Sequence, residues 1–102
     1  MSSSVSTYQI IQYLDQRSFR HSNAGFMIIV HVLEAMIRGE AHRQNLVKAY
    51  ELVAQQANIS KDSVEKSIRF AIRNSKVKGM TNKEFICRAY DDLVFQEQEI
   101  PT

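Results

Sequence analysis

A four-residue interruption, Ala57-Asn58-Ile59-Ser60, separates two helical patterns in the second half of the chain. The pattern before it, from about Arg43 to Gln56, repeats apolar residues at spacings of three and four, which is typical of an amphipathic helix. The pattern after it, from Ser60 to Asn74, has the same periodicity. Two helices joined by so short a connection must pack directly against each other, and this restricts the possible folds strongly.

The residues of this connection suit a steep crossing of the two helices. Ala54 is small where the helices approach, and Asn58 tolerates the left-handed backbone of a turn. Either Ser60 or Asp62 can cap the second helix. The Ile59 side chain is expected to be buried between the two helices. The expected inner faces are Leu46, Val47, Tyr50, Val53 and Ala54 on the first helix, and Val64, Ile68, Ala71 and Ile72 on the second. The pattern predicts a helix-turn-helix unit.

Three further helices are expected around this unit. Tyr8 to Gln16 carries an apolar stripe, and Ala24 to Arg38 is apolar on nearly every side. Thr81 and Glu84 have the spacing of a capping box before a last helix. Three glycines and one proline in 102 residues also favour helices over strands. We predict an all-α bundle of five helices, or six if a short extra turn is counted, over residues 6–96, with a disordered start (1–5) and an acidic tail (97–102).

Positive charge is concentrated on one segment, although the net charge of the chain is only +2. From Ser60 to Gly79 two acidic residues stand against six basic ones: Lys61, Lys66, Arg69, Arg73, Lys76 and Lys78. From Asp91 to Thr102 there are four acidic residues and no lysine or arginine. A basic helix that follows a short turn is typical of a helix that enters the DNA major groove. We expect the segment from Ser60 to Asn74 to be such a recognition helix on double-stranded DNA.

Each residue of this segment has an expected role. Ser60 and Lys61 are expected to meet phosphates at the start of the helix. The base edges are expected to face Ser63, Glu65, Lys66 and Arg69, with Glu65 able to accept a hydrogen bond from a cytosine amine. The flanking DNA backbone is expected to contact Arg73, Lys76 and Lys78. For Phe70 we favour packing, against a partner helix or under the loop at Lys76, over contact with a thymine methyl group.

Three runs of sequence resemble one known family. They are Ala49-Tyr50-Glu51-Leu52-Val53-Ala54, then Ser60 to Ile72 with its V-E-K-x-I-R-x-A-I element, and Thr81-Asn82-Lys83-Glu84-Phe85-Ile86. Together they resemble the C-terminal effector domain of the master sporulation response regulator family, stage-zero sporulation protein A, from about Gly25 to Leu93. The resemblance implies a helical DNA-binding transcription regulator that docks as a homodimer on tandem sites upstream of sporulation and stationary-phase genes.

Matches and departures from that family bear on specificity and regulation. Glu65 and Arg69 match family positions that face the groove, whereas Lys66 stands where the family has Arg. Ser63 and Phe70 stand where the family usually has Arg and His. Lysine does not make the bidentate guanine contact of arginine, so we expect either a different target sequence or low specificity. The receiver domain of the family is not recognised in this chain, and the connection before the last helix is shorter, near the surfaces that the family uses for dimer and RNA polymerase contacts.

Two other readings stay open from the sequence. The charges at Lys61, Glu65, Arg69 and Arg73 have the spacing of a self-paired ladder on an ordinary solvated helix. Alternatively, the chain is a receiver-less protein-interaction module that modulates a full-length homologous regulator without binding DNA. The acidic tail and the low net charge favour this second reading.

Enzymes, metal proteins and membrane proteins are not favoured by the sequence. His21, His31 and His42 lack the spacing of metal ligands, and no phosphate-binding glycine loop or catalytic constellation is visible. We therefore expect no cofactor, no metal and no catalytic residue. The single Cys87, the absence of a secretory signal pattern and the absence of a long apolar run predict a cytoplasmic protein without a membrane partner.

Overall fold

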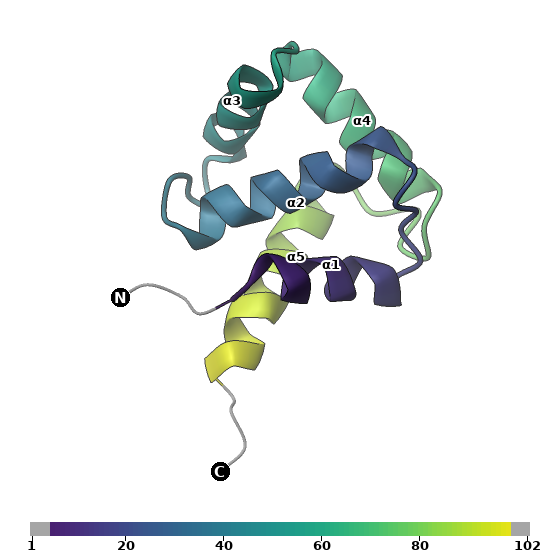
Figure 1. Cartoon of the computed structure of the whole chain (residues 1–102), viewed down its shortest axis with the longest axis vertical. Coiled ribbons are helices and arrows are strands. Elements are labelled where there is room, and N and C mark those ends of the chain that lie inside the picture. The colour runs from purple at the N-terminus through teal and green to yellow at the C-terminus, as the bar shows by residue number, and fades with distance from the viewer. Residues whose placement is uncertain (1–4, 99–102) are drawn as a thin grey trace.

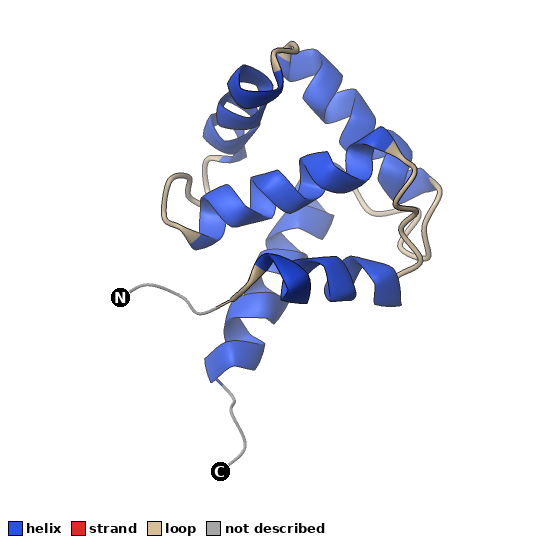
Figure 2. Cartoon of the chain, in the orientation of Figure 1, coloured by secondary structure: helices blue, strands red, loops and turns tan. Residues whose placement is uncertain are grey.

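The computed structural model describes residues 5–98, and for residues 96–98 it describes the backbone alone. Residues 1–4 and 99–102, which make up most of the predicted disordered start and acidic tail, lie outside the described residues. Within the described range the chain is all-helical and forms five helices without a strand (Figure 2). The helices are α1 (Thr7–Gln16), α2 (Ala24–Ile37), α3 (Leu46–Ala57), α4 (Lys61–Arg73) and α5 (Asn82–Gln98).

Local capping explains where most of the helices begin. The Ser60 side chain accepts a hydrogen bond from the Ser63 amide, and the Asn23 side chain accepts one from the Gly25 amide. At α5 the predicted capping box is present, because the Thr81 amide donates to Glu84 Oε1 (2.8 Å) and the Glu84 amide donates to Thr81 Oγ1 (3.1 Å). These short-range hydrogen bonds are why the starts of α2, α4 and α5 could be predicted.

The start of α3 differs from the prediction. We expected the helix to begin near Arg43, but it begins at Leu46. The Asn45 amide donates to the His42 carbonyl (2.8 Å), and the Gln44 amide donates to His42 Nδ1 (3.2 Å), so residues 42–45 form a closed turn instead. Val47, expected on the inner face, is 47% exposed, and Ala49 is buried in its place.

Helix α2 is the centre of the hydrophobic core. It contacts all four other helices, and Ile29, Val30, Val32 and Leu33 are fully buried along it. In Figure 1, α2 lies across the molecule, with α3 and α4 above it and α1 and α5 below. Full burial of an aliphatic side chain stabilises the fold by about 1.5–3 kcal/mol, so a helix buried on nearly every side can organise the other four.

Gly25 brings the start of α2 very close to α4. A Cβ atom at this position would lie 2.2 Å from the Ser67 carbonyl oxygen and 2.8 Å from Ala71 Cβ. Both distances are far below van der Waals contact, so only glycine fits between the two backbones. This close packing fixes the position of α4 relative to the core. Among the described residues, no helix is long and apolar enough to cross a membrane.

Candidate nucleic-acid interface

Helix α4 has one buried face and one exposed face, as its sequence pattern predicts. The four residues expected on the inner face are all buried: Val64, Ile68, Ala71 and Ile72. They pack mainly against α2, with further contacts to α3 and α5. Polar and charged side chains dominate the opposite face, where the exposed residues are Asp62, Ser63, Lys66, Arg69, Phe70 and Arg73. The core therefore holds α4 in a position that leaves its basic face accessible.

The connection between α3 and α4 has the predicted backbone but not the predicted side-chain packing. Asn58 adopts the left-handed conformation (φ 58°, ψ 45°) that ends α3. The Ile59 amide donates to the Ala54 carbonyl (3.0 Å), which closes the turn. Ile59 itself is 38% exposed and is not buried between the helices as we expected. The turn lies at the top of the molecule in Figure 1, where no other helix comes over it to bury the side chain.

The first turn of α4 is occupied with interactions of its own. The Ser60 hydroxyl caps the helix and also donates to Ser63 Oγ (3.0 Å). Lys61 Nζ lies 3.5 Å from Glu65 Oε2, an ion pair one helical turn apart. One ion pair of the charge series considered from the sequence is therefore present, and it places the Glu65 carboxylate beside Lys61.

The remaining basic residues of α4 have no such partner. Lys66, Arg69 and Arg73 are exposed and form no ion pair with any described side chain. No described ion pair therefore engages the cations over the last two turns of the exposed face of α4. Of the charge series Lys61, Glu65, Arg69 and Arg73, only the first two residues form an ion pair among the described side chains.

Basic residues elsewhere in the molecule are more often ion-paired than those near α4. Of the 13 lysines and arginines, five form ion pairs with described carboxylates: Arg17, Arg38, Arg43, Lys61 and Arg88. Three of these five bind Asp91 or Asp92 on α5. The basic residues without a described carboxylate partner are Arg20, Lys48, Lys66, Arg69, Arg73, Lys76, Lys78 and Lys83. Six of these eight belong to α4, the connection after it, or the first turn of α5. Charge is thus segregated in the folded chain.

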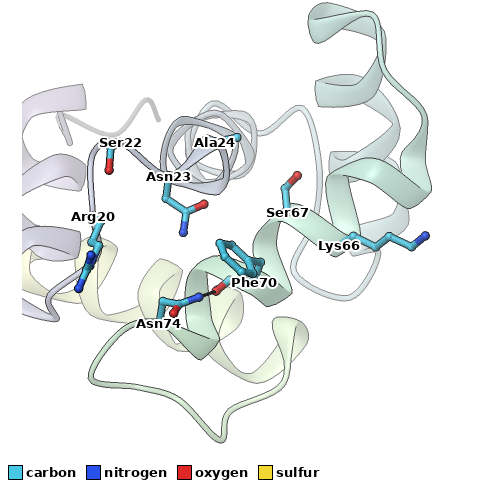
Figure 3. A pocket seen from close by; sticks show the side chains of 8 residues that line it. All are labelled: Arg20, Ser22, Asn23, Ala24, Lys66, Ser67, Phe70 and Asn74. Carbon is cyan, nitrogen blue, oxygen red and sulfur yellow. Dashed lines mark hydrogen bonds between the residues drawn. The ribbon is translucent and has the colours of Figure 1, made fainter.

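A hollow of about 560 Å³ lies between α4 and the start of α2 (Figure 3). Phe70 stands in its centre with 57% of its surface exposed, so the side chain does not pack into the protein. Arg20 lies on the opposite wall, and Lys66 extends outward from α4 on the other side of Phe70. Asn74 Nδ2 donates to the Phe70 carbonyl (2.8 Å), which fixes the Asn74 side chain at the C-terminal end of α4. The full lining is Arg20, Ser22, Asn23, Ala24, Lys66, Ser67, Phe70 and Asn74.

A second hollow, of about 460 Å³, lies on another side of α4, against the start of α5. Its lining is Tyr50, Glu65, Arg69, Met80, Thr81, Asn82 and Lys83. Asn82 Nδ2 donates to the Glu65 carbonyl (2.9 Å) and ties the start of α5 to α4. Burial, with the nearby charges of Glu65 and Cys87, raises the pKa of Tyr50 to about 12, so its hydroxyl stays protonated at neutral pH.

The connection from α4 to α5 carries the last two predicted site residues. The Lys76 amide donates to the Arg17 carbonyl at the end of α1 (2.9 Å), and the buried Ser75 hydroxyl donates to the Ile72 carbonyl (2.7 Å). The side chains of Lys76 and Lys78 are exposed. The structure thus groups Lys66 with Phe70 and Glu65 with Arg69, whereas Arg73, Lys76 and Lys78 line neither hollow.

Two basic residues that the sequence did not single out join this region. Arg20 comes from the connection between α1 and α2, and Lys83 from the first turn of α5. Each lines one of the two hollows together with residues of α4. The cluster of basic and polar residues from Arg17 to Asn23 was a visible signal, but no local pattern could place it beside a helix some 40 positions later.

Within the described part of the chain, no three His, Cys, Asp or Glu side chains come together as a metal site would require. Comparisons with protein-family models, with curated proteins and with solved structures find no match to this chain. The resemblance to the sporulation effector domain therefore stays a prediction from the sequence.

Proposed function

We propose that this chain is a transcription regulator that binds double-stranded DNA through a helix-turn-helix unit formed by α3 and α4. The observation that carries the proposal is the exposed row of cations without ion-pair partners on α4, opposite a face that is buried. Cations without internal partners are available to neutralise DNA phosphates, which supplies the sequence-independent part of DNA binding.

The dimensions of α4 suit the major groove. The helix has 13 residues, which gives a length of about 20 Å, and an α-helix with its side chains is about 10–12 Å across. The major groove is about 12 Å wide and admits a helix of this size. The turn between α3 and α4 lies at one edge of the molecule (Figure 1).

Individual side chains have different tasks in this proposal. Arg69 can donate two parallel hydrogen bonds to a guanine, while Lys66 supplies a single point charge. Phe70 is exposed beside them and can contact a thymine methyl group, which is the second of its two readings. Ser60 and Ser63 are engaged in the cap and Lys61 with Glu65, so we assign them a weaker part than the sequence suggested.

Binding by one module of this size is weak, so we propose that two copies occupy adjacent half-sites. The resemblance to the sporulation effector domain supports the same arrangement and a role in transcription. RNA polymerase or a full-length homologous regulator would then be a protein partner on the promoter.

The proposal is tested by selecting a binding site from random duplexes and titrating it by fluorescence anisotropy. We expect Arg69→Ala to weaken binding by about 1–3 kcal/mol on the selected site and to relax base preference at one position. Arg38→Ala is the matched control, because Arg38 is an exposed arginine paired with Glu40 at the far end of α2. Binding should also weaken steeply as salt rises. No selected site, or an affinity that does not change with salt, would overturn the proposal.

A protein-interaction module is the second candidate, and one surface favours it. Phe95 is 57% exposed near the end of α5, in a shallow hollow of about 350 Å³ that Tyr90, Asp91, Asp92 and Val94 also line. An exposed aromatic side chain in a shallow hollow suits an apolar contact with a protein partner. Size-exclusion chromatography with a two-domain homologue tests this: co-elution that Phe95→Ser abolishes would support it, and separate elution would contradict it.

A further inference from the structure

We infer that the DNA-binding surface extends beyond α4, and that Arg20 and Lys83 hold phosphates of the two strands that border the groove. This inference rests on the proposed function and adds two residues and an orientation to it. The observation behind it is that each of these cations lines one of the two hollows together with residues of α4, and neither has a described carboxylate partner.

The helical positions of the lining residues place the hollows on two sides of α4. Lys66, Phe70 and Asn74 are spaced by four and form one row, which borders the hollow with Arg20. Glu65 and Arg69 form a separate row, which borders the hollow with Lys83. Neighbouring residues on a helix point about 100° apart, so these rows diverge, with the exposed Arg73 between them.

This arrangement matches the shape of a duplex around an inserted helix. When the ridge of α4 lies in the major groove, the sugar-phosphate backbones rise on both sides of it. The elements beside the ridge then meet phosphates. Arg20 and Lys83 are the cations on the outer walls, one on each side. Polar side chains that suit phosphate oxygens accompany them, namely Ser22 and Asn23 on one wall and Thr81 on the other.

Both walls are fixed relative to α4, so their cations are preorganised. The wall with Arg20 is attached through the close packing of Gly25 on the Ser67 carbonyl. The wall with Lys83 is attached through the hydrogen bond from Asn82 Nδ2 to the Glu65 carbonyl (2.9 Å). Little backbone freedom is then lost when the duplex docks, which favours contacts from these positions.

The experiment measures the salt dependence of binding for charge-removing variants on the selected duplex and on an unrelated one. We expect Arg20→Ala and Lys83→Ala each to reduce the slope of log K against log salt by about 0.9, and the double variant by about 1.8. A slope difference of about 0.9 over the tenfold range from 1 M to 0.1 M salt is a factor of about eight. At 0.1 M salt each single variant should therefore bind about eightfold more weakly than the wild type. The loss should be equal on both duplexes, because phosphate contacts carry no sequence information.

Matched variants separate charge from structure. Arg20→Lys and Lys83→Arg keep the charge and should keep the slope, and Arg38→Ala removes a distant, paired charge and should leave the slope unchanged. Circular dichroism checks that each variant is folded. Wild-type slopes in both alanine variants would overturn the inference while the proposed function stands, and a slope change in only one would overturn its two-sided form. Failure of the wild-type chain to bind any duplex would overturn the proposed function itself.

Neutral methylphosphonates in the duplex locate the contacts. Replacing the phosphate that Arg20 binds should weaken the wild-type chain but not Arg20→Ala, and a different phosphate should behave in this way for Lys83. We expect the two phosphates on opposite strands across one major groove. Two positions on the same strand would contradict the arrangement.

Discussion

Gly25 offers a direct test of how α4 is held, through the substitution Gly25→Ala. The added Cβ would lie 2.2 Å from the Ser67 carbonyl oxygen, which is about 1 Å or more short of ordinary contact. The obstructing atom belongs to the backbone of α4, so no side chain can rotate away. Relief requires α2 and α4 to separate, which would loosen the contacts of Phe26 and Ile68 in the core.

The expected magnitude follows from two opposing effects. Overpacking costs about 1–3 kcal/mol, and the upper half of that range, about 2–3 kcal/mol, applies here because the obstructing atom is backbone; replacing a helical glycine by alanine gains about 1 kcal/mol. We therefore expect a net loss of about 1–2 kcal/mol in the free energy of unfolding. For a chain of this size that corresponds to a fall in Tm of about 4–16 °C.

Thermal and urea denaturation followed by circular dichroism measure this loss. Ala24→Ser is the matched control, because it adds one atom to the neighbouring exposed residue of the same helical turn and should change Tm by little. The Gly25→Ala variant should also bind DNA more weakly at temperatures where it remains folded, since α4 is displaced from the walls beside it. An unchanged or higher Tm for Gly25→Ala would show that the two helices are not packed as closely as described.

Two further substitutions test local features. Asn58→Ala should destabilise the fold by about 1–2 kcal/mol because the left-handed conformation (φ 58°) strains an alanine; Asn58→Gly should restore the stability, and equal urea midpoints for the two variants would contradict this reasoning. Glu34→Gln tests the link between α1 and α2. Burial acts to raise the pKa of the Glu34 carboxyl. Hydrogen bonds from Thr7 and His31, with nearby positive charge, outweigh burial and lower this pKa below its ordinary value of 4.5. A lowered pKa means that the carboxylate stabilises the fold above pH 4.5 and that this contribution is lost as pH falls through the lowered value. The wild type should therefore be more stable than Glu34→Gln by about 1–3 kcal/mol at pH 7, and this difference should vanish in acid. A difference that persists at pH 2 would contradict a stabilising role for the ionised carboxylate.

Much of the fold could be predicted because its signals are local. The caps of α2, α4 and α5 depend on side chains within three residues of the helix start, and the buried face of α4 follows from the spacing of Val64, Ile68 and Ala71. The errors occur where distant parts of the chain decide. Ile59 has an apolar side chain, yet it is exposed because no element covers the α3–α4 turn.

The candidate site was predicted in part for the same reason. Helical periodicity identified the exposed cations on α4, Lys66, Arg69 and Arg73 among them. It could not show that Lys61 pairs with Glu65 while the other three have no described partner, because both arrangements have the same spacing. Phe70 also had two readings until its exposure was known.

The sequence by itself determined the number and order of the helices, the caps of α2, α4 and α5, and the buried face of α4, because these depend on interactions within one or two helical turns. Only the tertiary structure decided which charges neutralise each other and which elements stand beside α4. Arg20 and Lys83 are more than 60 positions apart in the chain, and their places on either side of one helix follow from how α2 and α5 pack on it. Packing of this kind joins residues through the shape of the core, and no local spacing records it.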